Sequence, residues 1–289
     1  MLRLINFAHS EVFMIGTLGA LFATRWFGIT TASPAKTGLG LVLVLGGCLL
    51  VAMAFSGTTA VLLERIAYRP LRKRGAGRLA ALISAIGASL FLQELVGQPR
   101  GTWWTFGLAQ GRDFRPFPRL MAKSHHYFHG ADFRNDKILI FVGAIVMMLM
   151  LDRFVKLTKV GRGIRSVSQD PETAALMGVN IDRVVTITFL LGGLMAGAAG
   201  LLYLVFIENT AYYIGVVLGI KAFTAAVLGG IGNLRGALVG GLLLGLMETY
   251  GSAIFGTQWK DPISFVLLVL ILMVRPTGLL GEQLGKARV

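Results

Sequence analysis

The sequence predicts an all-α protein whose helices span a membrane as a polytopic bundle. Of its 289 residues, 55% are hydrophobic and only 15% are charged, against about 25% charged residues in an ordinary soluble domain. The mean hydropathy is +0.71. The apolar residues also fall in long blocks, which separates a membrane protein from a soluble protein with a large core.

The apolar blocks define the expected spans, because a helix needs about 20 residues to cross the hydrocarbon core of a bilayer. The first and fourth blocks are marginal in length. We expect about eight spans, which together form a single transmembrane domain over residues 1–289. The blocks lie at about residues 12–27, 38–63, 79–97, 138–155, 184–207, 214–232, 236–256 and 261–280.

The N-terminus has a competing interpretation as a signal peptide, since Arg3 precedes an apolar run. Asn6, His9 and Glu11 interrupt that run, and the rest of the chain is also apolar. We therefore expect the first block to be retained as a helix. Cys48 is the only cysteine, so no disulfide within the chain is possible.

Basic residues between the blocks set the orientation. The connection at residues 64–78 holds six Lys or Arg in fifteen positions, and the connection at 156–183 is basic as well. Because cytoplasmic loops carry the excess of Lys and Arg, both connections are expected in the cytoplasm. This topology accounts for the net charge of +14 without a nucleic-acid partner.

The segment 98–136 then falls outside the membrane, although it too is basic. His125, His126 and His129 lie close together in it. A metal site is conceivable there, but no acidic or cysteine ligand stands at a telling spacing. We favour an external loop without a metal.

The second half of the chain is rich in glycine at helical spacing. Gly193 with Gly197 and Gly241 with Gly245 are two of its GxxxG pairs, which permit close helix packing. The run 229–233 (GGIGN) has three glycines in four residues, each of which weakens a helix by about 1 kcal/mol relative to alanine. It predicts a helix break, either an ordinary turn or a discontinuous helix beside a substrate.

Four charged residues lie in or at the edges of the apolar blocks: Glu11, Glu94, Lys221 and Glu248. A charge at the centre of a spanning helix costs about 2.5–3.5 kcal/mol on insertion scales, so each must face a partner, a cavity or water. Lys221 and Glu248 form a plausible pair that fixes helix register, or alternatively lines a path for cargo. Glu94 lies close enough to the end of its apolar block for its side chain to reach the membrane–water interface.

No enzymatic motif is visible in the sequence. It contains no GxxxxGK[ST] phosphate-binding loop, HExxH motif or cysteine–histidine cluster. Asn6, His9 and Glu11 form a polar group without an evident nucleophile. We therefore expect neither catalysis nor a bound cofactor.

The basic connection at 156–183 contains a predicted short helix. Asp170 suits the N-cap, Pro171 the first helical position, and Gly178 the end. A short helix with a small apolar face on the cytoplasmic side suits docking into a groove of a partner protein. A surface helix without a partner is the alternative.

Four stretches of the chain resemble the permeases of the branched-chain amino acid ABC importers, the hydrophobic amino acid uptake family of the Liv type. They follow the family order, and the first resembles the LivH-type permease more than its LivM-type companion. The stretches are Ile5–Gly16 (INFAHSEVFMIG), Leu82–Gln93 (LISAIGASLFLQ), Gly161–Asp182, and Ala226–Gly236 (AVLGGIGNLRG) continuing to Gly245.

The resemblance implies a multi-pass permease subunit in a bacterial inner (plasma) membrane, in contact with lipid. Its expected partners are two cytoplasmic ATPase subunits, a second permease subunit of the LivM type and an extracytoplasmic solute-binding protein. Transport would proceed by alternating access. The short helix becomes a coupling helix that contacts the ATPase. The coupling residues that the resemblance implies are Gly163, Arg165, Asp170, Pro171, Ala174, Ala175 and Gly178.

The expected cargo is a branched-chain or other neutral amino acid, with urea or short amides as the alternative within the family. An autonomous secondary transporter or channel is a third possibility from another class. The resemblance provides no residue-level motif for the cargo path, so the path residues are guesses from polarity: Asn6, His9, Glu11, Lys221 and Glu248.

The chain departs from the family pattern in two places. Ser10 stands where the family motif usually has glycine, which is expected to alter helix packing slightly. Met1 falls where family members already have one transmembrane helix behind them. We therefore expect the sequence to lack the family's first transmembrane helix.

Overall fold

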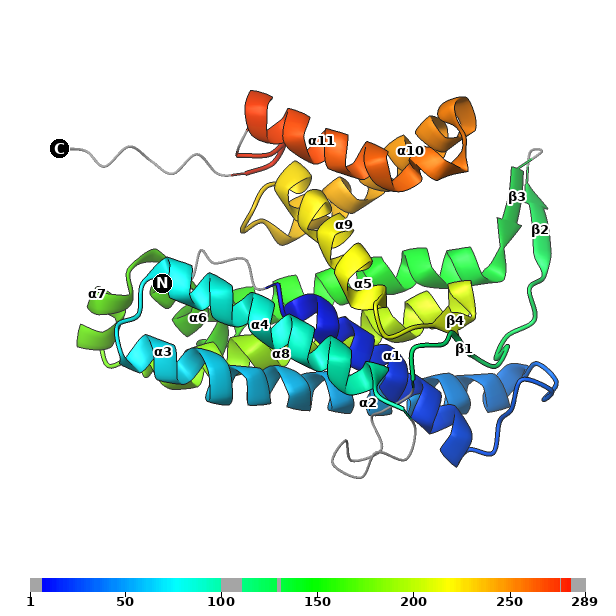
Figure 1. Ribbon diagram of the computed structural model, residues 1–289, viewed down its shortest axis with the longest axis horizontal. Coiled ribbons are helices and arrows are strands. Elements are labelled where there is room, and N and C mark those ends of the chain that lie inside the picture. Colours follow the sequence, from blue (N-terminus) through cyan, green and yellow to red (C-terminus); the bar gives the residue numbers. More distant parts are fainter. Residues whose placement is uncertain (1–6, 100–110, 129–130, 276, 282–289) are drawn as a thin grey trace. The chain divides into compact units, whose positions relative to one another are not determined.

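The computed structural model describes residues 7–99, 111–128, 131–275 and 277–281. Helices dominate it, as predicted, and the four strands are short (Figure 1). The helices are α1 (His9–Trp26), α2 (Gly38–Leu63), a π-helix (Glu64–Tyr68), α3 (Arg69–Lys73), α4 (Arg78–Gly97), α5 (Asn135–Leu157), α6 (Lys159–Gln169), α7 (Pro171–Leu176), α8 (Ile181–Ile207), α9 (Ile214–Gly229), α10 (Leu234–Phe255), a 3-10 helix (Thr257–Trp259) and α11 (Lys260–Val274).

Each predicted apolar block coincides with one helix. Among the described residues, six helical stretches are long and apolar enough to cross a membrane. Helix α9 is apolar but has only 16 residues, and α1 has 18 residues with a buried glutamate in its first turn. The bundle is therefore all-α and polytopic, and the count of eight spans stays a prediction. The six stretches are Gly38–Lys73, Leu79–Gly97, Asn135–Leu157, Ile181–Ile207, Leu234–Phe255 and Thr257–Val274.

The chain divides into two compact units. One comprises Met1–Gly143 and Arg153–Val216, and the other Ala144–Asp152 and Val217–Val289. The first unit is built on α1, α2 and α8, each of which packs against the other two (Figure 1). The prediction of a single domain over the whole chain stays a prediction.

Glycines allow the close approach of α1, α2 and α8. A Cβ atom added at Gly16 would lie 2.7 Å from the Cα atom of Gly197, and one added at Gly193 would lie 2.6 Å from the Cβ atom of Ala60. Real Cβ atoms do not approach this closely, so the backbones meet here because no side chain separates them. The Gly193–Gly197 pair is thus a packing motif.

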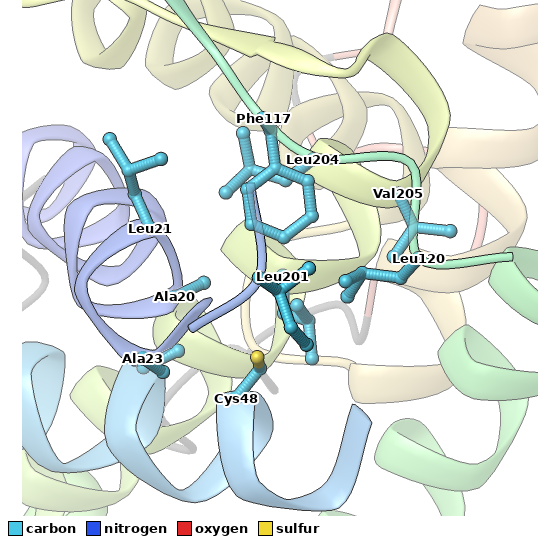
Figure 2. Packing of buried hydrophobic residues seen from close by; sticks show 11 residues of the cluster. Ala20, Leu21, Ala23, Cys48, Phe117, Leu120, Leu201, Leu204 and Val205 are labelled. Atoms are coloured by element: carbon cyan, nitrogen blue, oxygen red, sulfur yellow. The ribbon is translucent and has the colours of Figure 1, made fainter. Parts of the chain in front are cut away.

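One end of this unit has an apolar core, which Figure 2 shows from close by. Side chains from α1, α2 and α8 meet there with two residues of the segment predicted to be external, Phe117 and Leu120. The lone cysteine, Cys48, is fully buried in this cluster. The remaining members that Figure 2 labels are Ala20, Leu21, Ala23, Leu201, Leu204 and Val205.

The segment 98–136, which the sequence predicts to be external, contains short strands where the structure describes it. Strand β1 (Arg115–Pro116) pairs antiparallel with β4 (Asn209–Thr210), just after α8. Strands β2 (His125–Phe128) and β3 (Ala131–Arg134) form a hairpin. His125 and His126 lie on β2, whereas His129 lies outside the described residues. Within those residues, no group of three metal-ligating side chains is present.

The second unit contains the predicted helix break. Helix α9 ends at Gly229, and Gly230 and Gly232 have φ angles of +108° and +97°, which favour glycine. The Asn233 side chain then caps α10 by accepting hydrogen bonds from the backbone of Arg235 and Gly236. The run is therefore a tight interhelical turn.

Candidate functional site

The segment between α5 and α8 has the capping residues that the sequence predicted. The Asp170 carboxylate accepts hydrogen bonds from the backbone N–H groups of Glu172 (3.0 Å) and Thr173 (3.3 Å), and Pro171 is the first residue of α7. Gly178 follows the helix with a φ of +81°. A hydrogen bond from the Thr173 hydroxyl, together with the backbone bonds, holds the pKa of Asp170 below its usual range. The carboxylate therefore remains a charged cap near neutral pH.

The predicted coupling residues fall into an inward and an outward set. Ala174 is only 4% exposed and packs with Val167 and Val184. A Cβ atom added at Gly163 would lie 3.2 Å from Val184, so this glycine also faces α8. Arg165 and Ala175 are exposed. Only the outward set is positioned to contact a partner directly.

Two residues that were not among the predicted coupling residues dominate the outward surface of α7. Leu176 is 88% exposed and Met177 is 80% exposed. The signal was present in the sequence, since two large apolar residues stand directly before the helix-ending Gly178. Large exposed apolar side chains next to a buried alanine are typical of a docking surface.

The first predicted polar group lies in the first turn of α1, with Asn6 outside the described residues. The Glu11 side chain is fully buried, and Ser89 of α4 donates a 3.3 Å hydrogen bond to its Oε1 atom. Its Oε2 atom has no hydrogen-bond partner among the described residues. A Cβ atom at Gly215 would lie 2.6 Å from Oε2, so Glu11 abuts the start of α9.

Neighbouring residues place this group partway along α8. A Cβ atom at Gly192 would lie 3.1 Å from the His9 ring, while Gly16 meets Gly197. Gly192 lies eleven residues into α8, about 17 Å from its first residue at 1.5 Å per residue. Helix α1 therefore begins beside the middle of α8 and runs in the same direction, so that His9 and Glu11 lie at the mid-depth of α8.

The second predicted polar group forms within the second unit. Lys221 of α9 lies 3.1 Å from Glu248 of α10, as predicted, and 2.7 Å from Asp261 at the start of α11. Ser264 donates a hydrogen bond to Glu248. Asp261 and Ser264 were missed because they lie at the edge of the last apolar block, where polar residues are common.

A third polar cluster lies at the C-terminal end of α8. Glu208, which follows α8 with a left-handed φ of +58°, lies 2.7 Å from Lys123 and 3.2 Å from Arg119. Partial burial raises the pKa of Glu208, but hydrogen bonds from Lys123 and Arg119 outweigh burial and lower the pKa overall. These ion pairs hold residues 119–123 against the end of α8.

A polytopic helical bundle with charged side chains at helix mid-depth and a short capped helix between two long apolar helices is consistent with a membrane transport subunit. The chain belongs to the family of branched-chain amino acid transport system permease components, whose sequence model matches residues 1–272. The fold expectation and the resemblance in the sequence are thereby confirmed. The protein is a multi-pass permease subunit of an ABC importer and acts as a transport component.

The similarity extends over nearly the whole chain. The high-affinity branched-chain amino acid permease LivH of Escherichia coli K12 is 39% identical over 96% of this chain and 86% of its own length. BraD of Pseudomonas aeruginosa, named for the same transport system, is 38% identical with the same coverage. A probable LivH of Methanocaldococcus jannaschii is 27% identical over 98% of this chain and 85% of its own length. No solved structure matches the chain.

Proposed function

We propose that this subunit translocates branched-chain or other neutral amino acids into a bacterial cell by alternating access, powered by two separate cytoplasmic ATPase subunits. The observation that carries the proposal is the likeness to LivH and BraD over 96% of the chain. Both relatives are named as permeases of high-affinity branched-chain amino acid transport systems. The membrane is then the bacterial inner membrane.

Helix α7 is the proposed contact with an ATPase subunit. It is capped at both ends and exposes Leu176 and Met177. Its buried side packs on Val167 and Val184, so a partner that moves α7 also moves the start of α8. The sequence contains no phosphate-binding loop, which is consistent with hydrolysis by a partner.

The proposed cargo path includes His9 and Glu11 at the start of α1. Glu11 is a buried carboxylate with one oxygen unpartnered among the described residues. An intramembrane carboxylate in this state is a functional-site candidate, because its burial is unfavourable unless a partner arrives. Lys221 and Glu248 were guessed as path residues from polarity, but their proposed role is to fix helix register, since Asp261 and Ser264 already complete their cluster.

The remaining proposed partners are a second permease subunit of the LivM type and an extracytoplasmic solute-binding protein. The decisive experiment reconstitutes the complete transporter in proteoliposomes with its binding protein. We expect ATP-dependent uptake of labelled leucine, isoleucine or valine and no uptake by this chain alone. Uptake of labelled urea, without uptake of any amino acid, would show that the cargo is urea and not an amino acid. Uptake by this chain without ATPase subunits would overturn the proposed mechanism.

A further inference from the structure

A charged cluster ties the cytoplasmic end of α2 to the first turns of α8. Arg72 of α3 lies 3.0 Å from Glu64 and 2.5 Å from Asp182, and so bridges two carboxylates. The Thr186 hydroxyl donates a 3.0 Å hydrogen bond to the other oxygen of Glu64. Glu64 and Arg72 come from the α2–α3 stretch, whereas Asp182 and Thr186 belong to α8.

The burial of this cluster distinguishes it from a surface ion pair. Glu64 is 0% exposed, and the Arg72 side chain is 10% exposed. Apolar residues of similar volume hold helices together as well as a buried ion pair, or better. Stability alone therefore does not explain charged groups here, whereas a defined geometry between the two helices does.

The backbone at the cluster is also irregular. Residues Glu64–Tyr68 form a π-helix between α2 and α3, an insertion that is typical of functional sites. Two arginine donors, Nε of Arg69 and Nη1 of Arg72, are buried without a hydrogen-bond partner among the described residues. Arg69 lies 3.7 Å from Asp182. The spare donors would allow the two guanidinium groups to exchange acceptors if α8 shifts against α2.

The α8 side of the cluster is continuous with the segment that carries α7. Asp182 lies six residues after the end of α7. Val184, two residues further on, packs against Val167 of α6 and Ala174 of α7. Helices α6 and α7 and the first turn of α8 therefore share one small apolar core, and a displacement of α7 reaches Asp182 through packed side chains.

We propose that Glu64, Arg72, Asp182 and Thr186 form a polar latch that transmits movement of α7 to α2. The latch rests on the proposed function, because it requires a partner that moves α7. Its members are positioning residues, since they act through their contacts with one another. Without the latch, α7 still binds the ATPase subunit and ATP is still hydrolysed, but α2 does not move together with α8.

The test measures how many ATP molecules are hydrolysed for each cargo molecule taken up by the complete transporter in proteoliposomes. Asp182→Asn weakens the ion pair with Arg72, and Thr186→Val removes the hydrogen bond to Glu64. Neither variant changes the deeply buried Glu64 itself. Arg65→Gln is the matched control, because Arg65 lies on the same π-helix but is exposed. We expect uptake to fall about threefold to tenfold, equivalent to about 0.7–1.4 kcal/mol of coupling, while ATP hydrolysis stays within about twofold.

A conservative variant and a measurement of thermal stability distinguish a latch that transmits movement from one that only stabilises the fold. Asp182→Glu is expected to regain most of the uptake because it keeps the carboxylate, and Arg65→Gln is expected to match the wild type. If the two latch variants keep the wild-type ATP-to-cargo ratio in a working transporter, the latch is overturned, even if their thermal stability falls. If the wild-type transporter shows no ATP-driven amino acid uptake, the proposed function fails and the latch with it.

Discussion

Lys221 Nζ lies 3.1 Å from Glu248 Oε1, which joins the middle of α9 to α10. Asp261 Oδ1 lies 2.7 Å from the same nitrogen, and Ser264 donates to Glu248. One ammonium group thus holds two carboxylates from two other helices. Every charge in this cluster has a partner, which favours a role in fixing the packing of the second unit.

Removing one member of this pair is expected to harm the protein more than removing both. Lys221→Met leaves Glu248 buried beside Asp261 without a cation, and a broken buried pair costs about 1–3 kcal/mol where one partner reaches solvent. The double variant Lys221→Met/Glu248→Met should recover most of the thermal stability and of the uptake. Unfolding of the detergent-solubilised complex and uptake assays measure the two effects.

Two outcomes would contradict that expectation. A double variant that regains stability but transports nothing would make Lys221 and Glu248 path residues. A loss in the double variant equal to the sum of the two single losses would show that the two side chains do not depend on each other. The control is Asp152→Asn, which removes a carboxylate partner of the exposed Arg235 in the same unit.

Glycine pairs with identical spacing are expected to respond differently to substitution. Gly197→Ala would place a Cβ atom 2.5 Å from the carbonyl oxygen of Ala52, whereas a Cβ atom at Gly245 meets nothing within 4 Å. We expect Gly197→Ala to destabilise by about 1–3 kcal/mol through overpacking. Gly245→Ala should be neutral or stabilising by up to about 1 kcal/mol, because alanine is the better helix former.

Thermal unfolding of the two glycine variants under the same conditions compares them directly. Equal melting temperatures would contradict the close approach of α2 and α8. Gly241→Ala serves as a second open-site control, since a Cβ atom there also meets nothing within 4 Å.

The glycines illustrate how far sequence reasoning reaches in this fold. Composition and block length predicted the helices because a bilayer demands about 20 apolar residues per span. The GxxxG spacing did not reveal which pairs are packed, because spacing defines a helix face and not what lies opposite it. Gly197 meets α2, while Gly245 faces open space in the described chain.

The candidate site divides in the same way. Asp170, Pro171 and Gly178 were identifiable because capping follows local chemical rules. The inward orientation of Ala174 was not, because it depends on Val167 and Val184, which lie on other helices. The Glu64–Asp182 cluster escaped notice for the same reason: its members are more than a hundred residues apart.

Substitutions on α7 are expected to separate docking from folding. Met177→Asp places a charge on an exposed apolar position, so uptake and the stimulation of ATP hydrolysis should fall about tenfold or more, as for an interface anchor worth at least 1–2 kcal/mol. The melting temperature should not change. Ala174→Asp instead buries a carboxylate against Val167, and should lower the melting temperature as well.

Ser168→Asp is the matched control for Met177→Asp. It adds the same charge to an exposed position of α6 without removing an apolar side chain. Unchanged ATPase stimulation in Met177→Asp would exclude α7 as the contact. A fall in Ser168→Asp as large as that in Met177→Asp would mean that added negative charge alone is responsible.

The ion pairs of Glu208 are expected to keep the external segment in place throughout mildly acidic conditions. Burial raises the pKa of Glu208, but Lys123 and Arg119 lower it overall, to below the ordinary value of 4.5. A group with a depressed folded-state pKa contributes stability above its unfolded pKa, and loses that contribution as the pH falls through the folded value.

Hydrogen exchange of residues 115–123 should therefore show equal protection at pH 8 and pH 5, after correction for the intrinsic rate. Glu208→Gln should reduce protection at both pH values, whereas Glu94→Gln, which removes an exposed partner of Arg112, should not. Loss of protection in the wild type between pH 8 and pH 5 would show that another group controls this closure.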